Sequence, residues 1–163
     1  MQLASKDLGR IVNEYPELIQ YLDVIQSQPE FVGYHFINHM PIIREMFNYS
    51  LYVIKRRWPE AESYIMKDTC YAYNYAEYVI KGRWPEIEPI IMKDKHYAWA
   101  YAYNVIQGRW SEAEPYIMKN AWYIYKYARD VIKGRWPEAE PMIKQVSLVW
   151  SLYVSDVVEP LYE

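Results

Sequence analysis

Apolar side chains recur three and four residues apart through most of the chain, and this helical pattern itself repeats every 26 residues. The clearest marker of the repeat is a dipeptide, found at Arg57-Trp58, Arg83-Trp84, Arg109-Trp110 and Arg135-Trp136. Aligned on these pairs, the copies read RWPEAESYIMK, RWPEIEPIIMK, RWSEAEPYIMK and RWPEAEPMIKQ, and the segments before them read YSLYVIKR, YAEYVIKG, YAYNVIQG and YARDVIKG. Four copies at one fixed spacing predict an all-α fold, an α-solenoid of stacked two-helix repeats.

Each copy is predicted to hold a long helix followed by a short one. The long helix begins after a good N-cap residue, namely Asp68, Asp94 or Asn120, and should end at a left-handed glycine, namely Gly82, Gly108 or Gly134. The second element starts at Trp-Pro, yet a further proline recurs four residues later as Pro89, Pro115 and Pro141. Because proline has no N–H, we expect a tight or 3₁₀-like turn there, followed by a short helix through the IMK segment.

The repeat divides the chain into three parts of a single domain, residues 1–163. We expect an N-terminal helical cap over 1–41, four copies over 42–145, and a C-terminal capping half-repeat over 146–163. The half-repeat stays in register through Tyr153, Val157 and Val158 and should end at Pro160.

Positions that all four copies keep must serve stacking, because stacking is what the copies share. The tyrosines Tyr49, Tyr75, Tyr101 and Tyr127 are expected to form a continuous core with the Val-Ile pairs that follow them. The repeated tryptophans should seal the corner between the two helices. The repeated arginines and glutamates are expected to form structural ion pairs, although a charged binding ladder is the alternative interpretation.

Variable positions on the long helix are where specificity would lie. The predicted exposed stripe is Cys70, Asn74, Glu77, Tyr78 and Lys81 in the second copy, His96, Ala100, Tyr103, Asn104 and Gln107 in the third, and Trp122, Lys126, Arg129, Asp130 and Lys133 in the fourth. Tyrosine, tryptophan and arginine dominate the binding energy of protein interfaces. The residues expected to bind a protein are therefore Tyr78, Tyr103, Asn104, Trp122, Lys126 and Arg129. The alternative is that a solvated face has simply drifted in sequence.

Composition narrows the function classes. The chain has 163 residues, of which 52% are hydrophobic, with 19 tyrosines, seven tryptophans and a net charge of -3. These proportions exclude a disordered, collagen-like or disulfide-stapled chain and a strongly basic nucleic-acid binder. The single cysteine, Cys70, cannot form an internal disulfide. We expect no signal peptide at Met1–Arg10, because no apolar run follows a basic cluster there, and the longest uncharged stretches are shorter than a bilayer span. We therefore expect a cytoplasmic protein with no membrane association.

Motifs that carry chemistry are scarce. Nucleotide-binding loops, nucleophile elbows and paired metal-binding cysteines do not occur in the sequence. His35 and His39 could share a helical face as metal ligands, and Cys70 and His96 occupy equivalent positions in successive copies, but neither pair has the further groups its chemistry needs. The expectation is a protein that is not an enzyme and has no cofactor, metal site or catalytic residue.

A phrase of the type VIKGRWPEAEPYIMK, over about residues 42–159 and most closely 71–144, resembles a repeat of uncharacterised proteins, many of them encoded by tailed bacteriophages. More loosely, the two-helix unit resembles Sel1-like, tetratricopeptide and leucine-rich-variant arrays. The phage resemblance implies a small protein that binds and inhibits or redirects a host protein, including a defence component, in the host cytoplasm. It supplies no binding or catalytic residue.

The sequence thus predicts a non-enzymatic scaffold that binds another protein, whose identity it does not reveal. Two alternatives remain open. A nucleic-acid binder could use the aligned basic residues Lys55, Arg56, Lys81 and Lys133. A self-assembling structural protein could form homo-oligomers by end-to-end stacking of imperfect caps.

Overall fold

The computed structural model describes residues 41–159, and all the regular structure in that range is helical, with no strand. The predicted all-α class is confirmed for this part of the chain. By its contacts the chain divides between Glu45 and Met46, and the second unit holds the helices that follow the start of α3. The predicted cap, apart from Pro41, and the residues His35, His39 and Pro160 lie outside the described range.

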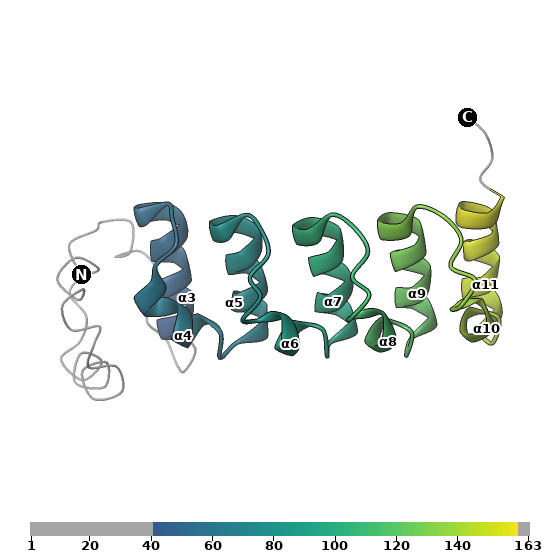
Figure 1. Ribbon diagram of the computed structural model, residues 1–163, viewed down its shortest axis with the longest axis horizontal. Coiled ribbons are helices and arrows are strands. Elements are labelled where there is room, and N and C mark those ends of the chain that lie inside the picture. The colour runs from purple at the N-terminus through teal and green to yellow at the C-terminus, as the bar shows by residue number, and fades with distance from the viewer. Residues whose placement is uncertain (1–40, 160–163) are drawn as a thin grey trace. The chain divides into compact units, whose positions relative to one another are not determined.

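Each copy has the same succession of elements: an α-helix that continues as a π-helix, and then a short α-helix. The long helices are α3 (Pro41–Asn48) with η3 (Tyr49–Ile54), α5 (Thr69–Asn74) with η4 (Tyr75–Ile80), α7 (Lys95–Tyr101) with η5 (Ala102–Ile106), α9 (Ala121–Tyr127) with η6 (Ala128–Ile132), and α11 (Ser147–Tyr153) with η7 (Val154–Val158). The short helices are α4 (Pro59–Ile65), α6 (Glu88–Ile91), α8 (Glu114–Ile117) and α10 (Glu140–Ile143). Helices α5, α7, α9 and α11 contact one another in chain order and stand in a row, with α6, α8 and α10 near one end of them (Figure 1).

The predicted N-caps of the long helices are confirmed. Asp68 accepts a hydrogen bond from the Tyr71 N–H at 3.0 Å, and Asp94 accepts one from the His96 N–H at 2.8 Å. Asn120 caps α9 in the same way. Because the first N–H groups of a helix have no partner within it, these short polar side chains define where each long helix starts.

The predicted glycine C-cap is wrong. The left-handed residues are Lys55, Lys81, Gln107 and Lys133, with φ between 54° and 57°, and none of the described glycines has a positive φ. The cause is the π-helical second half of the long helix. The N–H of Lys81 bonds five residues back to the carbonyl of Ala76, and the N–H of Gly82 reaches the same carbonyl at 3.2 Å. The chain therefore reverses at the lysine, one residue before the glycine.

The predicted turn is confirmed and a short helix follows it, but that helix ends at Ile91 and does not run through the IMK segment as expected. Two i→i+3 backbone hydrogen bonds form the turn. The Ile87 N–H donates to the Trp84 carbonyl, and the Glu88 N–H donates to the Pro85 carbonyl. Helix α6 then starts at Glu88, so that Pro89 falls in its first turn, where no N–H is needed. The first copy has Ser63 in place of this proline, and there α4 runs without a break from Pro59 to Ile65.

The core is built mainly from aromatic residues and alanine. Tyr75, Tyr101, Tyr127 and Tyr153 are fully buried, as are the alanine that follows each of the first three and the isoleucines of the short helices, Ile65, Ile91, Ile117 and Ile143. The Val-Ile pairs at 79–80, 105–106 and 131–132 are only half-buried, so the expectation that they complete the core is wrong in these copies. They lie on the π-helical turns, where 3.6-residue periodicity no longer predicts which side faces inward.

Candidate protein-binding face

One polar network joins each copy to the next. At the junction of the second and third copies, the Tyr101 hydroxyl accepts a hydrogen bond from the buried backbone N–H of Trp84 at 2.6 Å and donates one to Glu88 at 3.2 Å. Arg83 holds the same carboxylate with two hydrogen bonds of 2.8 and 2.7 Å. Tyr75, Tyr127 and Tyr153 make the equivalent bonds at the other junctions. Burial raises the pKa of Tyr101 to about 12, because the phenolate would lose its hydration.

The repeated tryptophans pack against the tyrosine of their own long helix. The ring centroids of Tyr75 and Trp84 are 5.2 Å apart, and those of Tyr101 and Trp110 are 5.1 Å apart. The four repeated tryptophan residues, Trp58, Trp84, Trp110 and Trp136, are all buried. Stacking of copies therefore accounts for the repeated tryptophan without any role in binding.

Each repeated arginine faces at least one carboxylate, and Arg57, Arg83 and Arg109 each face two. The pKa of Arg57 is raised chiefly by its hydrogen bonds to Glu62, and Glu86 of the next copy adds to this effect. The pKa of Arg83 is raised in the same way by Glu88 and Glu112. Because each guanidinium is matched by acidic groups, these exposed arginines do not form an unbalanced basic surface.

Three of the predicted binding residues are large, exposed aromatic side chains. Tyr78 is 48% exposed, Tyr103 is 47% exposed and Trp122 is 44% exposed. Tyr52, which is not among the predicted binding residues, is 62% exposed and lies 26 residues before Tyr78. The same repeat register identifies it, since it places both tyrosines at one position of the long helix.

The other predicted binding residues are tied to neighbouring side chains. The Asn104 amide donates a hydrogen bond of 2.7 Å to the Tyr73 hydroxyl of the preceding copy. The Lys126 ammonium lies 4.1 Å from the centroid of the Trp99 ring, also in the preceding copy. Arg129 pairs with Asp130 at 2.6 Å and donates to the Tyr125 hydroxyl at 2.8 Å.

The predicted stripe is not exposed along its whole length. Ala100 is buried and Asn74 and Lys126, at the same position of the unit, are half-buried. The Lys126 contact with Trp99 gives the reason, because it shows that this position lies against the preceding copy. Helical periodicity within one copy cannot reveal a neighbour that comes from another copy.

A layer of aromatic rings lies beneath the exposed side chains. It consists of two ring positions per long helix, here called the aromatic row: Phe47, Tyr71, Tyr73, Tyr97, Trp99, Tyr123 and Tyr125. Rings of successive copies meet across the junctions, with 5.9 Å between the centroids of Phe47 and Tyr71 and 5.7 Å between those of Tyr73 and Tyr97. His96 extends the row at the next junction, 6.1 Å from Tyr123. The sequence signal for this row is the recurrence of an aromatic residue at each of these positions.

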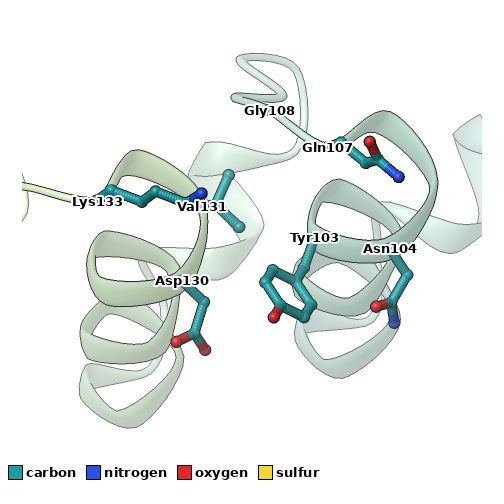
Figure 2. A pocket seen from close by; sticks show the side chains of 7 residues that line it. All are labelled: Tyr103, Asn104, Gln107, Gly108, Asp130, Val131 and Lys133. Atoms are coloured by element: carbon teal, nitrogen blue, oxygen red, sulfur yellow. The ribbon is translucent and has the colours of Figure 1, made fainter.

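An open pocket of about 340 Å³ lies between η5 and η6. Two predicted binding residues, Tyr103 and Asn104, line it together with Gln107, Gly108, Asp130, Val131 and Lys133. Figure 2 shows the Tyr103 ring and the Asp130 carboxylate facing the space between the two helices. The third and fourth copies thus enclose a polar depression bordered by an exposed aromatic ring.

The groups that the sequence offers for metal binding and nucleophilic chemistry can be located in the described residues. Within 41–159, no three His, Cys, Asp or Glu side chains lie close enough to hold a metal ion, and no helix there combines the length and the hydrophobicity of a membrane span. Cys70 is exposed, and its sulfur lies 3.4 Å from the Asn74 amide nitrogen. His96 packs against the rings of Tyr97, Trp99 and Tyr123. Neither contact is the sulfur–imidazole hydrogen bond that activates a nucleophilic cysteine.

No family model matches the chain, and neither a curated protein nor a solved structure matches it.

Proposed function

We propose that this chain is an α-solenoid that acts as a protein-binding scaffold, and that its partner docks on the long-helix face that carries Tyr78, Tyr103 and Trp122. The observation that supports this proposal most strongly is the exposure of these three rings, each between 44% and 48%, two of which pack on the aromatic row. Tyrosine and tryptophan supply much of the binding energy of protein interfaces, and exposed apolar patches mark interaction sites.

Two of the exposed rings are held in place before any partner arrives. Tyr103 stacks on Trp99 with 6.0 Å between ring centroids and 3° between the ring planes. Trp122 packs against Tyr125 with 5.4 Å between centroids. A side chain that is already fixed loses little conformational entropy when it is covered, so more of its buried area is available for affinity.

The alternative of nucleic-acid binding has weaker support. The exposed lysines Lys55, Lys81 and Lys133 lie 26 or 52 residues apart, one at the end of each of three long helices. The repeated arginines beside them are matched by carboxylates, which leaves no continuous basic groove in the described part of the chain. Protein binding makes no such demand on the charge.

Self-assembly is a second candidate, and one observation favours it. Leu148 on the last long helix is 71% exposed, and Val146, which stands where α5, α7 and α9 have a polar N-cap, is 43% exposed. An array that ends in an apolar surface can take a further copy.

From the phage resemblance we propose further that the partner is a protein of the host cytoplasm, which the scaffold inhibits or redirects. This part of the proposal rests on the resemblance and not on the geometry of the face.

Affinity capture from lysate of the native or infected cell tests the proposal. Wild-type protein is compared with the double variant Tyr103→Ala/Trp122→Ala and with the control Ile90→Ala/Met142→Ala, which truncates two apolar residues that are each 42% exposed but lie on the short helices. We expect one stoichiometric protein partner, retained by the control and weakened at least about tenfold by the first variant. All three proteins should keep the same circular dichroism spectrum.

Three results would contradict the proposal. The Tyr103/Trp122 variant could retain the partner as well as wild type does, which would remove the face from the account. Captured nucleic acid that is lost as salt is raised would favour the first alternative. Capture of the chain by itself alone would favour self-assembly.

A further inference from the structure

Two lysines from different copies converge on one ring at the junction of the third and fourth copies. Lys95 of α7 lies 6.0 Å from the centroid of Tyr123, and Lys126 of α9 lies 5.9 Å from it. Lys126 also lies 4.1 Å from the centroid of Trp99. A cation over an aromatic face is attracted to the π electrons, so both ammonium groups are positioned.

These lysines do not belong to the repeat. The positions equivalent to Lys95 hold Ile43, Thr69, Ala121 and Ser147, and those equivalent to Lys126 hold Asn48, Asn74, Ala100 and Leu152. Stacking of the other copies therefore does without them. A feature that occurs once in a periodic structure is a candidate for a function that the period does not serve.

Neither ammonium group has a carboxylate partner among the described residues. The acidic residues nearest in sequence are already engaged, because Asp94 caps α7 and Asp130 holds Arg129 with both of its oxygens. By contrast, the repeated arginines are each paired with a glutamate. The pair Lys95 and Lys126 thus leaves positive charge unmatched on this part of the aromatic row.

The same junction is also incomplete in hydrogen bonding. At two other junctions the polar group of the ring bonds to a side chain 31 residues later, Tyr73 to Asn104 and Tyr125 to Asp156. The equivalent partner of Trp99 would be Asp130, but Asp130 binds Arg129. The buried indole N–H of Trp99 therefore has no acceptor within the described part of the chain. The third and fourth copies therefore depart from the bonding scheme of their neighbours.

The two lysines and the pocket form one strip along the junction. Lys126 lies over Trp99, Trp99 stacks on Tyr103, and Tyr103 lines the pocket with Asn104 and Gln107. The strip follows α7 and η5 from Lys95 to Gln107, which is roughly 18 Å at the helical rise per residue. An extended peptide of about five or six residues covers that length.

We propose that this strip binds an extended acidic segment of a partner protein. A Glu or Asp carboxylate of the segment lies between Lys95 and Lys126. Uncharged residues of the segment lie over the pocket, where Asp130 would repel a second carboxylate, and their backbone bonds to the amide oxygen of Asn104, whose N–H already donates to Tyr73, and to the amide of Gln107. Opposite charge selects the segment, and amide groups that both donate and accept suit the polar groups of a free peptide strand. The assignment rests on the proposed protein-binding function and specifies the chemistry of the partner.

An NMR titration of the full-length, ¹⁵N-labelled protein tests this assignment. The probe is an acetylated and amidated hexapeptide of glutamate and tyrosine, compared with the peptide in which glutamine replaces every glutamate. We expect the amide signals of Lys95, Tyr123 and Lys126 to shift with the acidic peptide. Binding should weaken at least about tenfold with the glutamine peptide, and by a similar factor when salt is raised.

The decisive comparison uses two charge-matched double variants. Lys95→Gln/Lys126→Gln should lose at least about tenfold in affinity for the acidic peptide. Lys67→Gln/Lys119→Gln should bind it as wild type does, although these lysines also lie over tyrosine rings, 4.6 Å from the centroid of Tyr64 and 4.7 Å from that of Tyr116. Equal loss in both variants, full binding by the first, or no shift at millimolar peptide would each overturn the assignment.

The captured partner separates this assignment from the proposed function. A partner lost by the Tyr103/Trp122 variant but kept by the Lys95/Lys126 variant would leave the protein-binding face in place and refute the acidic segment. A partner kept by both variants would refute both. Loss in both, with the Lys67/Lys119 control unaffected, is the result expected.

Discussion

Replacing Tyr101 by phenylalanine removes one hydroxyl group from the contact between the second and third copies. That hydroxyl accepts a hydrogen bond from the backbone N–H of Trp84 at 2.6 Å and donates one to Glu88 at 3.2 Å. The Tyr101 side chain is fully buried. The ring and its packing against Trp110 are retained. The variant therefore isolates the hydrogen bonds from the apolar contact.

The cost follows from what is left behind. The backbone N–H of Trp84 becomes a buried donor without an acceptor, which costs about 1–3 kcal/mol. Glu88 keeps both hydrogen bonds from Arg83, so its contribution is small. We expect the Tyr101→Phe variant to lose about 2 kcal/mol in free energy of unfolding, measured by urea denaturation with tryptophan fluorescence.

The matched control is Tyr103→Phe. Tyr103 lies two residues after Tyr101, and the side chain that loses its hydroxyl there is 47% exposed. This change should alter the free energy of unfolding by less than about 0.5 kcal/mol. If Tyr101→Phe were as mild as the control, the tyrosine hydroxyl would not join the copies, and the account of the repeated Tyr-Trp-Glu network would be wrong.

Three further predictions concern the same array. First, burial raises the pKa of Tyr75, Tyr101 and Tyr127 to about 12, above the value near 10 of an unfolded chain, so the native state keeps protons that the unfolded state releases. Stability should be complete below about pH 10 and fall between about pH 10 and 12, by up to about 1.4 kcal/mol per pH unit for each tyrosine; urea midpoints that stay constant to pH 12 would contradict this. Second, Gly82→Ala should raise the free energy of unfolding by about 0.4–1 kcal/mol, because the glycine has no positive φ and an added Cβ meets nothing within 4 Å, whereas a left-handed glycine would make the change destabilising. Third, Trp110→Ala should lower it by about 3–5 kcal/mol in the same urea assay, and a loss under about 1 kcal/mol would mean that the tryptophan is not part of the core.

Much of the fold could be predicted because it depends on the effect of single residues on the neighbouring backbone. The Asp and Asn caps, the interrupted helix at Pro89 and the boundaries of the copies all follow from what one residue does to the backbone beside it. Repetition then separates these structural residues from variable ones within a single sequence.

The π-helical half of the long helix could not be predicted in this way. Its i→i+5 bonds leave no mark in helix propensity, and they move the left-handed residue from glycine to lysine. They also change the angular position of the later residues, which is why the Val-Ile pairs are less buried than 3.6-residue periodicity predicts.

The candidate site could be predicted only in part, because much of it is formed between copies. Exposure of Tyr78, Tyr103 and Trp122 follows from the pattern of one helix. The burial of Ala100, the contact of Lys126 with Trp99 and the pocket beside Tyr103 each need a second copy to be in place. A sequence read one helix at a time does not contain that information.

Site-specific photo-crosslinking tests the central claim, that a protein partner docks on the exposed face of the long helices. Benzoylphenylalanine is placed at position 103 in one protein and at position 90 in another. Tyr103 on a long helix is 47% exposed and Ile90 on a short helix is 42% exposed, so two sites of similar exposure are compared in the same type of cell. The account predicts one protein adduct from position 103 and none from position 90. An adduct from position 90 alone, or equal adducts from both, would contradict it.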